Sequence, residues 1–271
     1  MDFAFLDSGT GGLPYMKYLK ESFPEASCIY LADTKNFPYG QKSSKDIEEA
    51  ACEAVKLLLQ HCTPKAIVLA CNTMSVVALP KLRQVFSNIP FIGTVPAIKT
   101  AASITRNNII GLLATERTVQ EPYTDSLIRQ FAPNCKVIRR GDSQLISFIE
   151  HELDTSSATA RYKAIIPAVE YFSSNNVDTI VLGCTHFVHV AEDIKNATKN
   201  KIQVVDSRSG VVRQALKVAF ANQQNNHQNS KQDLLADNFF VTDLVDSSET
   251  NRYETLCRHQ GIRWGGVLKF Q

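Results

Sequence analysis

The chain has 271 residues, of which 44% are hydrophobic and 21% are charged, as in an ordinary globular protein. Lysine and arginine number 29 against 27 aspartates and glutamates, and a net charge of +2 gives no indication of a nucleic-acid-binding or membrane-surface function. We expect neither a signal peptide nor a membrane-spanning segment, because no stretch has the required length of apolar residues.

Strand-like runs alternate with helix-like segments along the chain, which is typical of βαβ units and parallel sheets. The runs are 3–7, 28–33, 66–70, 91–94, 109–114, 136–139, 179–183 and 203–206. They fall into two groups of four, so the sequence predicts an α/β protein with two four-stranded parallel sheets. The clearest helix covers 46–60, where apolar residues recur at helical spacing, and Ser43 with Asp46 predicts its cap.

The last quarter of the chain returns to ordinary structure after an interruption. A helix is expected to begin near Ser209, and the polar tract 221–233 is expected to be a mobile, non-catalytic excursion. A strand-like run at 239–243 and a helix-like segment at 247–260 follow, and we expect them to pack on the first lobe. The predicted lobes are therefore 1–96 with 208–271, and 97–207.

Two short stretches are nearly alike and provide the best indication of function. AIVLACNT at 66–73 and TIVLGCTH at 179–186 each run an apolar strand into one cysteine, Cys71 and Cys184. In open parallel sheets, ligands bind at the carboxyl ends of the strands. A thiol at the start of a helix also exchanges its proton more easily, and Asn72 or Thr73 is expected to cap the helix after Cys71. Two such thiols across a shared cleft suit proton transfer to opposite faces of one carbon.

Other interpretations of the cysteines remain open. The total is seven, an odd number with no CxxC pair, which is typical of reduced thiols in a cytoplasmic protein. A buried cysteine is most often a small apolar residue, and we assign that role to Cys28, Cys52, Cys62, Cys135 and Cys257. A zinc site of Cys71, Cys184 and His186 is disfavoured because structural ligands come in closely spaced pairs. A Cys184–His186 nucleophilic pair is disfavoured because we expect the two side chains to point to opposite faces of a strand, and because the second cysteine would then have no role.

The segment DSGTGG at 7–12 ends the first strand with a carboxylate and a glycine-rich turn. Backbone amides at such a turn bind phosphate or carboxylate, although a tight turn alone would also need glycines. Asp7 is placed to orient a base or to hold an ammonium group. FPYG at 37–40 predicts a turn that brings Tyr39 and Gly40 to the same edge of the sheet.

Five motifs in this order resemble those of the glutamate racemases, within the aspartate/glutamate racemase superfamily. They are DSGTGG, PYG, ACNT, GTVPA (93–97) and GCTH. The resemblance implies two pseudo-symmetric flavodoxin-like lobes with the active site in the cleft between them. It also implies interconversion of L- and D-glutamate, without a metal or other cofactor, that supplies D-glutamate for bacterial peptidoglycan.

The resemblance carries roles over to matching positions. Cys71 is expected to act on D-glutamate and Cys184 on L-glutamate. The groups expected to assist the thiols are Asp7, His186 and Glu150. The residues expected to hold the substrate are Asp7, Ser8, Tyr39, Gly40, Asn72, Thr73, Thr185 and His186. Besides glutamate, we expect a second copy of the chain as a partner in a homodimer. We expect neither a membrane nor a nucleic acid as a partner.

The chain departs from the family pattern beside both cysteines. Met74 stands where the family has a small residue, and Val188 stands where it has proline. These changes bear on substrate fit and rate rather than on the type of reaction. Racemisation of aspartate, another reaction of small dicarboxylates such as isomerisation or decarboxylation, and non-catalytic amino-acid binding remain the alternatives.

Overall fold

The computed structural model describes residues 1–220 and 237–270, which form two compact units. Unit 1 consists of Met1–Tyr39, Ser43–Thr94 and Arg208–Gln271, and unit 2 consists of Gly40–Lys42 and Val95–Ser207. The polar tract expected at 221–233 lies outside the described residues.

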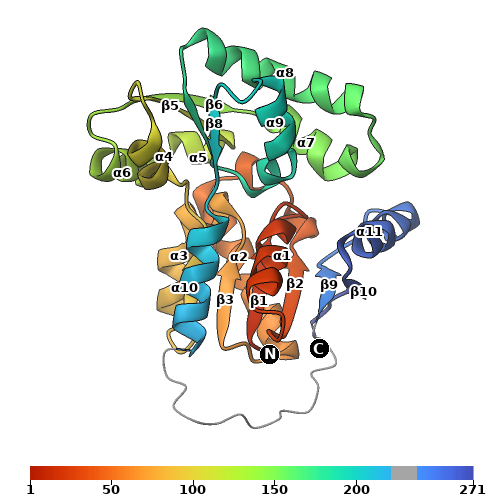
Figure 1. The fold of residues 1–271 in the computed structure, drawn as a ribbon. Coiled ribbons are helices and arrows are strands. Elements are labelled where there is room, and N and C mark those ends of the chain that lie inside the picture. Colours follow the sequence, from red (N-terminus) through yellow and green to blue (C-terminus); the bar gives the residue numbers. More distant parts are fainter. Residues whose placement is uncertain (221–236, 271) are drawn as a thin grey trace. The chain divides into compact units, whose positions relative to one another are not determined.

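Unit 1 is built on a six-stranded parallel sheet in the order β10-β9-β2-β1-β3-β4 (Figure 1). Its strands are β1 (Phe3–Asp7), β2 (Cys28–Ala32), β3 (Ala66–Leu69), β4 (Phe91–Gly93), β9 (Asn238–Val241) and β10 (Arg263–Val267). The α/β class and the first four strands are confirmed. The expectation of four strands was wrong for this unit, because β9 pairs with β2 and β10 extends the sheet by one more strand.

Helices cover both faces of this sheet. They are α1 (Leu13–Ser22), α2 (Ser44–His61), α3 (Asn72–Val85), α10 (Arg208–Phe220) and α11 (Ser247–Gln260), with the short 3₁₀ helices η1 (Thr34–Asn36) and η2 (Tyr39–Gln41) after β2. The helices α2 and α3 pack together, as do α1 and α10. The predicted cap is confirmed, since the Ser43 side chain accepts a hydrogen bond from the Asp46 backbone N–H.

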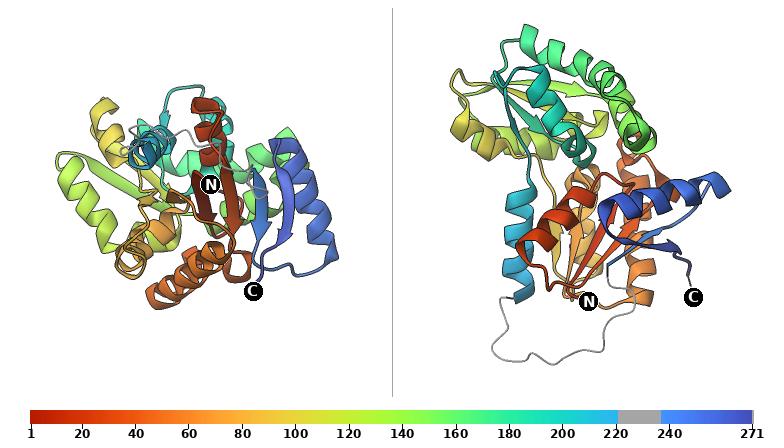
Figure 2. Two further views of the ribbon diagram at one scale, coloured as in Figure 1. Left: turned by 90° about the horizontal axis from the view of Figure 1, so that it is seen from below. Right: turned by 45° about the vertical axis from the view of Figure 1, so that its right-hand side comes forward.

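An aromatic stack joins the C-terminal elements to the centre of the sheet. Figure 2 shows α11 lying against β9 and β10. Tyr253 of α11 stacks on Trp264 of β10 with ring centroids 5.5 Å apart, and both rings contact Phe239 of β9. Phe239 in turn stacks on Tyr30 of β2 at 5.2 Å. Large buried rings contribute strongly to packing, so this stack fixes the C-terminal return against β2.

Unit 2 has a four-stranded parallel sheet in the order β6-β5-β7-β8. Its strands are β5 (Ile109–Ala114), β6 (Lys136–Gly141), β7 (Thr179–Leu182) and β8 (Gln203–Val205). Its helices are α4 (Ile98–Ile104), α5 (Glu116–Gln120), α6 (Pro122–Phe131), α7 (Ser143–His151), α8 (Ala158–Ser174) and α9 (Ala191–Ala197), with the 3₁₀ helices η3 (Leu153–Thr155) and η4 (Thr185–Val190). The four strands predicted for this part are confirmed.

The two sheets repeat one topology. The order β2-β1-β3-β4 in unit 1 corresponds strand for strand to β6-β5-β7-β8 in unit 2, which is the flavodoxin-like order. Such sheets bind ligands at the point where their first and third strands in chain order, here β1 and β3 or β5 and β7, end side by side. Cys71 follows β3 and Cys184 follows β7, so the two cysteines occupy equivalent positions at these two points. In the part of the chain that the structure describes, no helix has the length and apolar character to cross a membrane.

Candidate active site

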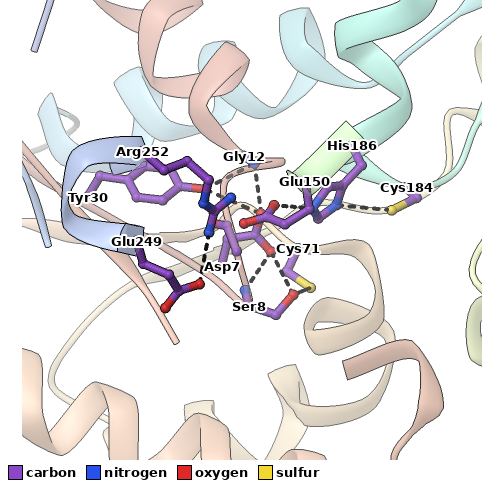
Figure 3. Close-up of polar contacts among 11 residues, drawn as sticks. Asp7, Ser8, Gly12, Tyr30, Cys71, Glu150, Cys184, His186, Glu249 and Arg252 are labelled. Carbon is purple, nitrogen blue, oxygen red and sulfur yellow. Dashed lines mark hydrogen bonds and ion pairs between the residues drawn. The ribbon is translucent and has the colours of Figure 1, made fainter. Parts of the chain in front are cut away.

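The glycine-rich turn after β1 wraps around the carboxylate of Asp7, which is completely buried. Asp7 Oδ1 accepts a hydrogen bond from the Ser8 backbone N–H at 2.7 Å, and Oδ2 accepts one from the Gly12 N–H at 2.7 Å (Figure 3). The Tyr30 hydroxyl lies 3.3 Å from Asp7 Oδ2 and donates to the Gly9 carbonyl at 2.9 Å. Donors on both oxygens stabilise a carboxylate without removing its charge.

Gly12 allows this turn to lie directly on the end of β3. A Cβ atom at Gly12 would lie 2.5 Å from the Ala70 Cβ and 2.8 Å from the Tyr30 hydroxyl, closer than real Cβ contacts come. A matching contact occurs in unit 2, where a Cβ at Gly183 would lie 3.1 Å from the Cβ of Ala114. Close approach of the two strand ends is therefore a shared property of both units, and in each unit it occurs beside the cysteine.

Cys71 lies where β3 leads into α3. Its backbone occupies the N-cap position of α3, and its side chain is 6% exposed. The prediction that Asn72 or Thr73 caps this helix was wrong, because both are already helical residues. The Ser8 hydroxyl lies 4.0 Å from Cys71 Sγ and 3.4 Å from Asp7 Oδ1, as Figure 3 shows. Ser8 thus stands between the carboxylate and the thiol.

Two buried polar side chains, Asn72 next to Cys71 and Thr94 in contact with Asn72, each have an oxygen without a hydrogen-bond partner among the described residues. Asn72 donates through Nδ2 to the Thr94 carbonyl at 3.2 Å. Within the described residues, neither Asn72 Oδ1 nor Thr94 Oγ1 has a hydrogen-bond partner, although both side chains are almost fully buried. An unsatisfied buried polar atom costs about 1–3 kcal/mol, so such atoms are typical of sites that complete their hydrogen bonds with a ligand.

The turn after β2 brings Tyr39 into the core of unit 1. Its hydroxyl donates to Asp33 Oδ2 at 2.6 Å, and burial followed by the charge of Asp33 raises the pKa of Tyr39 well above its ordinary value. The hydroxyl therefore remains a proton donor to Asp33. Gly40, the next residue, belongs to unit 2 and lies against Thr115 of the same unit, since a Cβ at Gly40 would be 2.8 Å from the Thr115 Cβ.

Unit 2 contains a linear relay of three side chains, Cys184, His186 and Glu150. Cys184 Sγ lies 3.7 Å from His186 Nδ1, and His186 Nε2 lies 2.8 Å from Glu150 Oε2 (Figure 3). All three side chains are at most 6% exposed. Burial alone lowers the pKa of His186, but hydrogen bonds to Cys184 and Glu150 and their charges outweigh it and raise the pKa well above its ordinary value. A protonated imidazole donates from both nitrogens, which matches its two neighbours.

This contact corrects one expectation from the sequence. Cys184 and His186 were expected to point to opposite faces of a strand. That expectation was wrong, because residues two apart on a strand share a face. In the structure β7 ends at Leu182, and Cys184 occupies the N-cap of the 3₁₀ helix η4 with its side chain beside that of His186. Thr185 between them is 1% exposed. The two departures from the family pattern are core residues, since Met74 is completely buried and Val188 is 7% exposed.

Several polar residues around these strand ends were not expected from the sequence. They are the buried Tyr30, Asp33, Thr94, Thr115 and Thr118 and the partly buried Thr242. Asp33 and Thr115 directly follow strands, and Asp7 is the last residue of one, so the same signal was available for them. Tyr30 lies inside an apolar strand, where the sequence does not indicate a polar role. Among residues 1–220 and 237–270, no group of three or more His, Cys, Asp or Glu side chains is arranged to hold a metal ion.

Residues 16–215 match the sequence profile of the Asp/Glu/Hydantoin racemase family. The chain belongs to this family. The family resemblance noted from the five motifs is therefore confirmed, and the match includes Cys71, Cys184, Glu150 and His186.

Individual relatives support the same placement over almost the whole length. The chain is 40% identical to a glutamate racemase of Treponema pallidum over 268 residues, which is 98% of this chain and 96% of the relative. A crystal structure of Escherichia coli glutamate racemase, in complex with L-glutamate and the activator UDP-MurNAc-ala, superposes with a TM-score of 0.84 at 30% identity and 98% coverage of both chains. An aspartate racemase of Picrophilus torridus, at 18% identity and a TM-score of 0.51 over 81% of this chain and 94% of its own, shares the fold alone.

Proposed function

We propose that this chain is an isomerase that interconverts L- and D-glutamate by moving the α-proton between two cysteines. The observation that carries the proposal is the equivalence of Cys71 and Cys184. Each follows the third strand of its sheet order, and each has its own polar neighbours. The 40% identity to a glutamate racemase over 98% of the chain supports glutamate as the substrate.

The proposed reaction balances with two sulfur atoms. One thiolate removes the α-proton from one face of the α-carbon, and the other thiol delivers its own proton to the opposite face. The enzyme then holds the reverse pair of protonation states, ready for the other enantiomer. This requires that both units contribute to one active site, with one thiol on each face of the substrate.

The relay in unit 2 supports an acid–base role for Cys184, the thiol that the family resemblance assigns to the L-enantiomer. A protonated His186 places positive charge 3.7 Å from Cys184 Sγ, where negative charge forms when the thiol gives up its proton. Glu150 accepts from the other nitrogen of the ring at 2.8 Å and keeps the imidazole oriented. Both residues are positioning groups for the thiol in this proposal.

The neighbours of Cys71, the thiol that the resemblance assigns to the D-enantiomer, support an acid–base role in a different way. Ser8 links the sulfur to the buried carboxylate of Asp7 through contacts of 4.0 and 3.4 Å. A hydroxyl both donates and accepts, so Ser8 can assist the thiol in either protonation state. In this proposal the negative charge lies on Asp7, and the Ser8 hydroxyl connects that carboxylate to the thiol by hydrogen bonds.

Removal of the α-proton creates a carbanion beside a carboxylate, and donors fixed around that carboxylate must stabilise it. We propose that Ser8, Thr73 and Thr185 supply hydroxyl donors. The unpaired Oδ1 of Asn72 is an acceptor suited to the ammonium group. Because the Tyr39 hydroxyl is engaged by Asp33, Tyr39 and Gly40 would contact the substrate through the main chain.

The biological setting follows from the family. We propose that the product D-glutamate supplies peptidoglycan synthesis in the bacterial cytoplasm, in keeping with seven cysteines that are all free thiols. A homodimer stays a prediction that the molar mass from light scattering will test.

Circular dichroism tests the proposal directly. L-glutamate, D-glutamate, L-aspartate and D-aspartate are each incubated with chelator-treated protein and no added cofactor. We expect the signal of both glutamate enantiomers to decay to zero and that of both aspartates to persist. Decay of the aspartate signal alone would favour the aspartate alternative. A flat glutamate signal together with calorimetric glutamate binding would favour a non-catalytic binding protein.

A further inference from the structure

A second buried carboxylate, outside the residues assigned to catalysis, lies at the carboxyl end of β2. Asp33 is 2% exposed and accepts hydrogen bonds from three side chains. Tyr39 donates at 2.6 Å, Thr242 at 2.9 Å, and Asn36 at 3.0 and 3.2 Å to the two oxygens. A buried carboxylate needs such a full set of donors, and loss of one donor is costly.

The donor Thr242 comes from the far end of the chain. It follows β9, which pairs with β2 in a register that sets Val241 opposite Ala32. The Thr242 hydroxyl also accepts a hydrogen bond from the Lys35 backbone N–H at 3.1 Å. Thr242 therefore contacts both the carboxylate and the backbone of the loop that leads from β2 to the turn at Tyr39 and Gly40.

A second threonine, Thr34, links the same two segments, and the hydrogen bonds described for its side chain do not involve the Asp33 carboxylate. The Thr34 hydroxyl donates to the Asp243 carbonyl at 2.5 Å and accepts from the Asp243 N–H at 3.0 Å. Thr34 and Thr242 are both partly buried. The chain thus offers two equivalent tethers, only one of which continues to Tyr39.

We propose that Asp33 and Thr242 are positioning residues, which hold the Tyr39–Gly40 turn in the place where its main chain binds the substrate. The C-terminal strand β9 acts in this way on the substrate site through one chain of hydrogen bonds, from Thr242 to Asp33 to Tyr39. This inference rests on the proposed function, because it takes the turn to be a substrate contact.

We expect the effect to be specific to binding. In the proposed function the turn binds the substrate equally before and during proton transfer, so its displacement should weaken both states alike. Loss of such uniform binding raises KM and leaves kcat unchanged. Valine has nearly the shape of threonine, so Thr242→Val removes the hydroxyl with little change in packing.

Steady-state kinetics of Thr242→Val, Thr242→Ser and Thr34→Val test this inference. We expect Thr242→Val to raise KM for both enantiomers about tenfold, which corresponds to about 1.4 kcal/mol, with kcat changed less than about twofold. Thr242→Ser keeps the hydroxyl and should restore KM. Thr34→Val breaks the matched tether and should leave KM near the wild-type value.

A measurement without substrate accompanies the kinetics. Hydrogen exchange of the amides in residues 37–41 should be faster in Thr242→Val than in the wild type, and should be unchanged in Thr34→Val. An unchanged KM in Thr242→Val, an equal rise in Thr34→Val, or a loss of kcat that Thr242→Ser does not restore would each overturn the inference. An inactive wild type with the expected exchange pattern would overturn the proposed function and leave the positioning of the turn standing.

Discussion

The two cysteines occupy equivalent places in two similar sheets, yet their neighbours differ in kind. Cys71 begins an α-helix and reaches the Asp7 carboxylate only through the Ser8 hydroxyl, at distances of 4.0 and 3.4 Å. Cys184 begins a 3₁₀ helix and contacts His186 directly, with Glu150 behind it. One topology therefore provides two different devices for holding a proton, and a reversible two-base reaction needs such a difference between its two thiols.

The largest effect should come from removing either sulfur. Cys71→Ser and Cys184→Ser should each lower racemisation about 1,000-fold or more, because serine is a far weaker acid than cysteine at the position of proton transfer. Polarimetry of L- and D-glutamate measures the loss. Cys52→Ser and Cys135→Ser, at one partly buried cysteine in each unit, are the controls and should keep full activity. Near-wild-type turnover in either catalytic variant would contradict the two-base reaction.

Glu150→Gln should have the next largest effect and should act on proton transfer at one of the two thiols, Cys184. It keeps the shape and a hydrogen bond to His186 but removes the charge, and we expect kcat to fall about 30-fold. Because the slowed step takes place at Cys184, the deuterium isotope effect should rise from α-deuterated L-glutamate and fall from α-deuterated D-glutamate.

The matched control is Glu152→Gln, two residues further along and exposed. It should change neither the rate nor the isotope effects. Equal isotope effects from the two enantiomers in Glu150→Gln would show that Glu150 does not act through Cys184.

The raised pKa of His186 predicts how stability depends on pH. A histidine whose pKa is higher in the folded than in the unfolded protein contributes stability that is complete below the unfolded value of 6.5. This contribution is lost as the pH rises through the folded value. Urea unfolding of the wild type should therefore show a falling free energy of unfolding above pH 6.5, by at most about 1.4 kcal/mol per pH unit from this one group.

His186→Gln should flatten this part of the profile, because glutamine does not titrate. Nothing comparable is expected around Cys71, whose neighbours include no histidine in the contacts described. A profile that keeps its slope in His186→Gln would assign the pH dependence to other groups.

Ser8→Ala should have the smallest effect, because the contacts of its hydroxyl are long. We expect kcat/KM to fall about fivefold, since the backbone N–H of Ser8 still donates to Asp7 at 2.7 Å. Ser22→Ala, at an exposed serine of α1, serves as the control in the same assay. A loss as large as that of Cys71→Ser would mean that Ser8 itself transfers the proton.

Local sequence patterns predicted the strands that carry the two cysteines and the helix α2. Apolar runs that end in a polar tripeptide identified β3 and β7, and the same residues placed Cys71 and Cys184 at equivalent strand ends. Hydrophobic periodicity and a serine cap identified α2. These features depend on residues close in sequence, so local patterns are sufficient to predict them.

The features that were missed depend on residues far apart in sequence. The pairing of β9 with β2 joins segments about 200 residues apart, so the six strands of unit 1 did not follow from the alternation of strands and helices. The link from Thr242 to Asp33 is missed for the same reason. The contact of Cys184 with His186 is a local one and was missed for another reason, since residues two apart on a strand share a face and the sequence therefore already allowed it.

The aromatic stack of unit 1 has a practical consequence. Trp264 is the sole tryptophan of the chain, and its ring is joined through Phe239 to Tyr30, whose hydroxyl lies 3.3 Å from Asp7 Oδ2. The tryptophan fluorescence of the protein therefore originates from one known position, three rings away from a group that we assign to the reaction. Its emission offers a label-free optical signal for rearrangements of the C-terminal strands when glutamate is added.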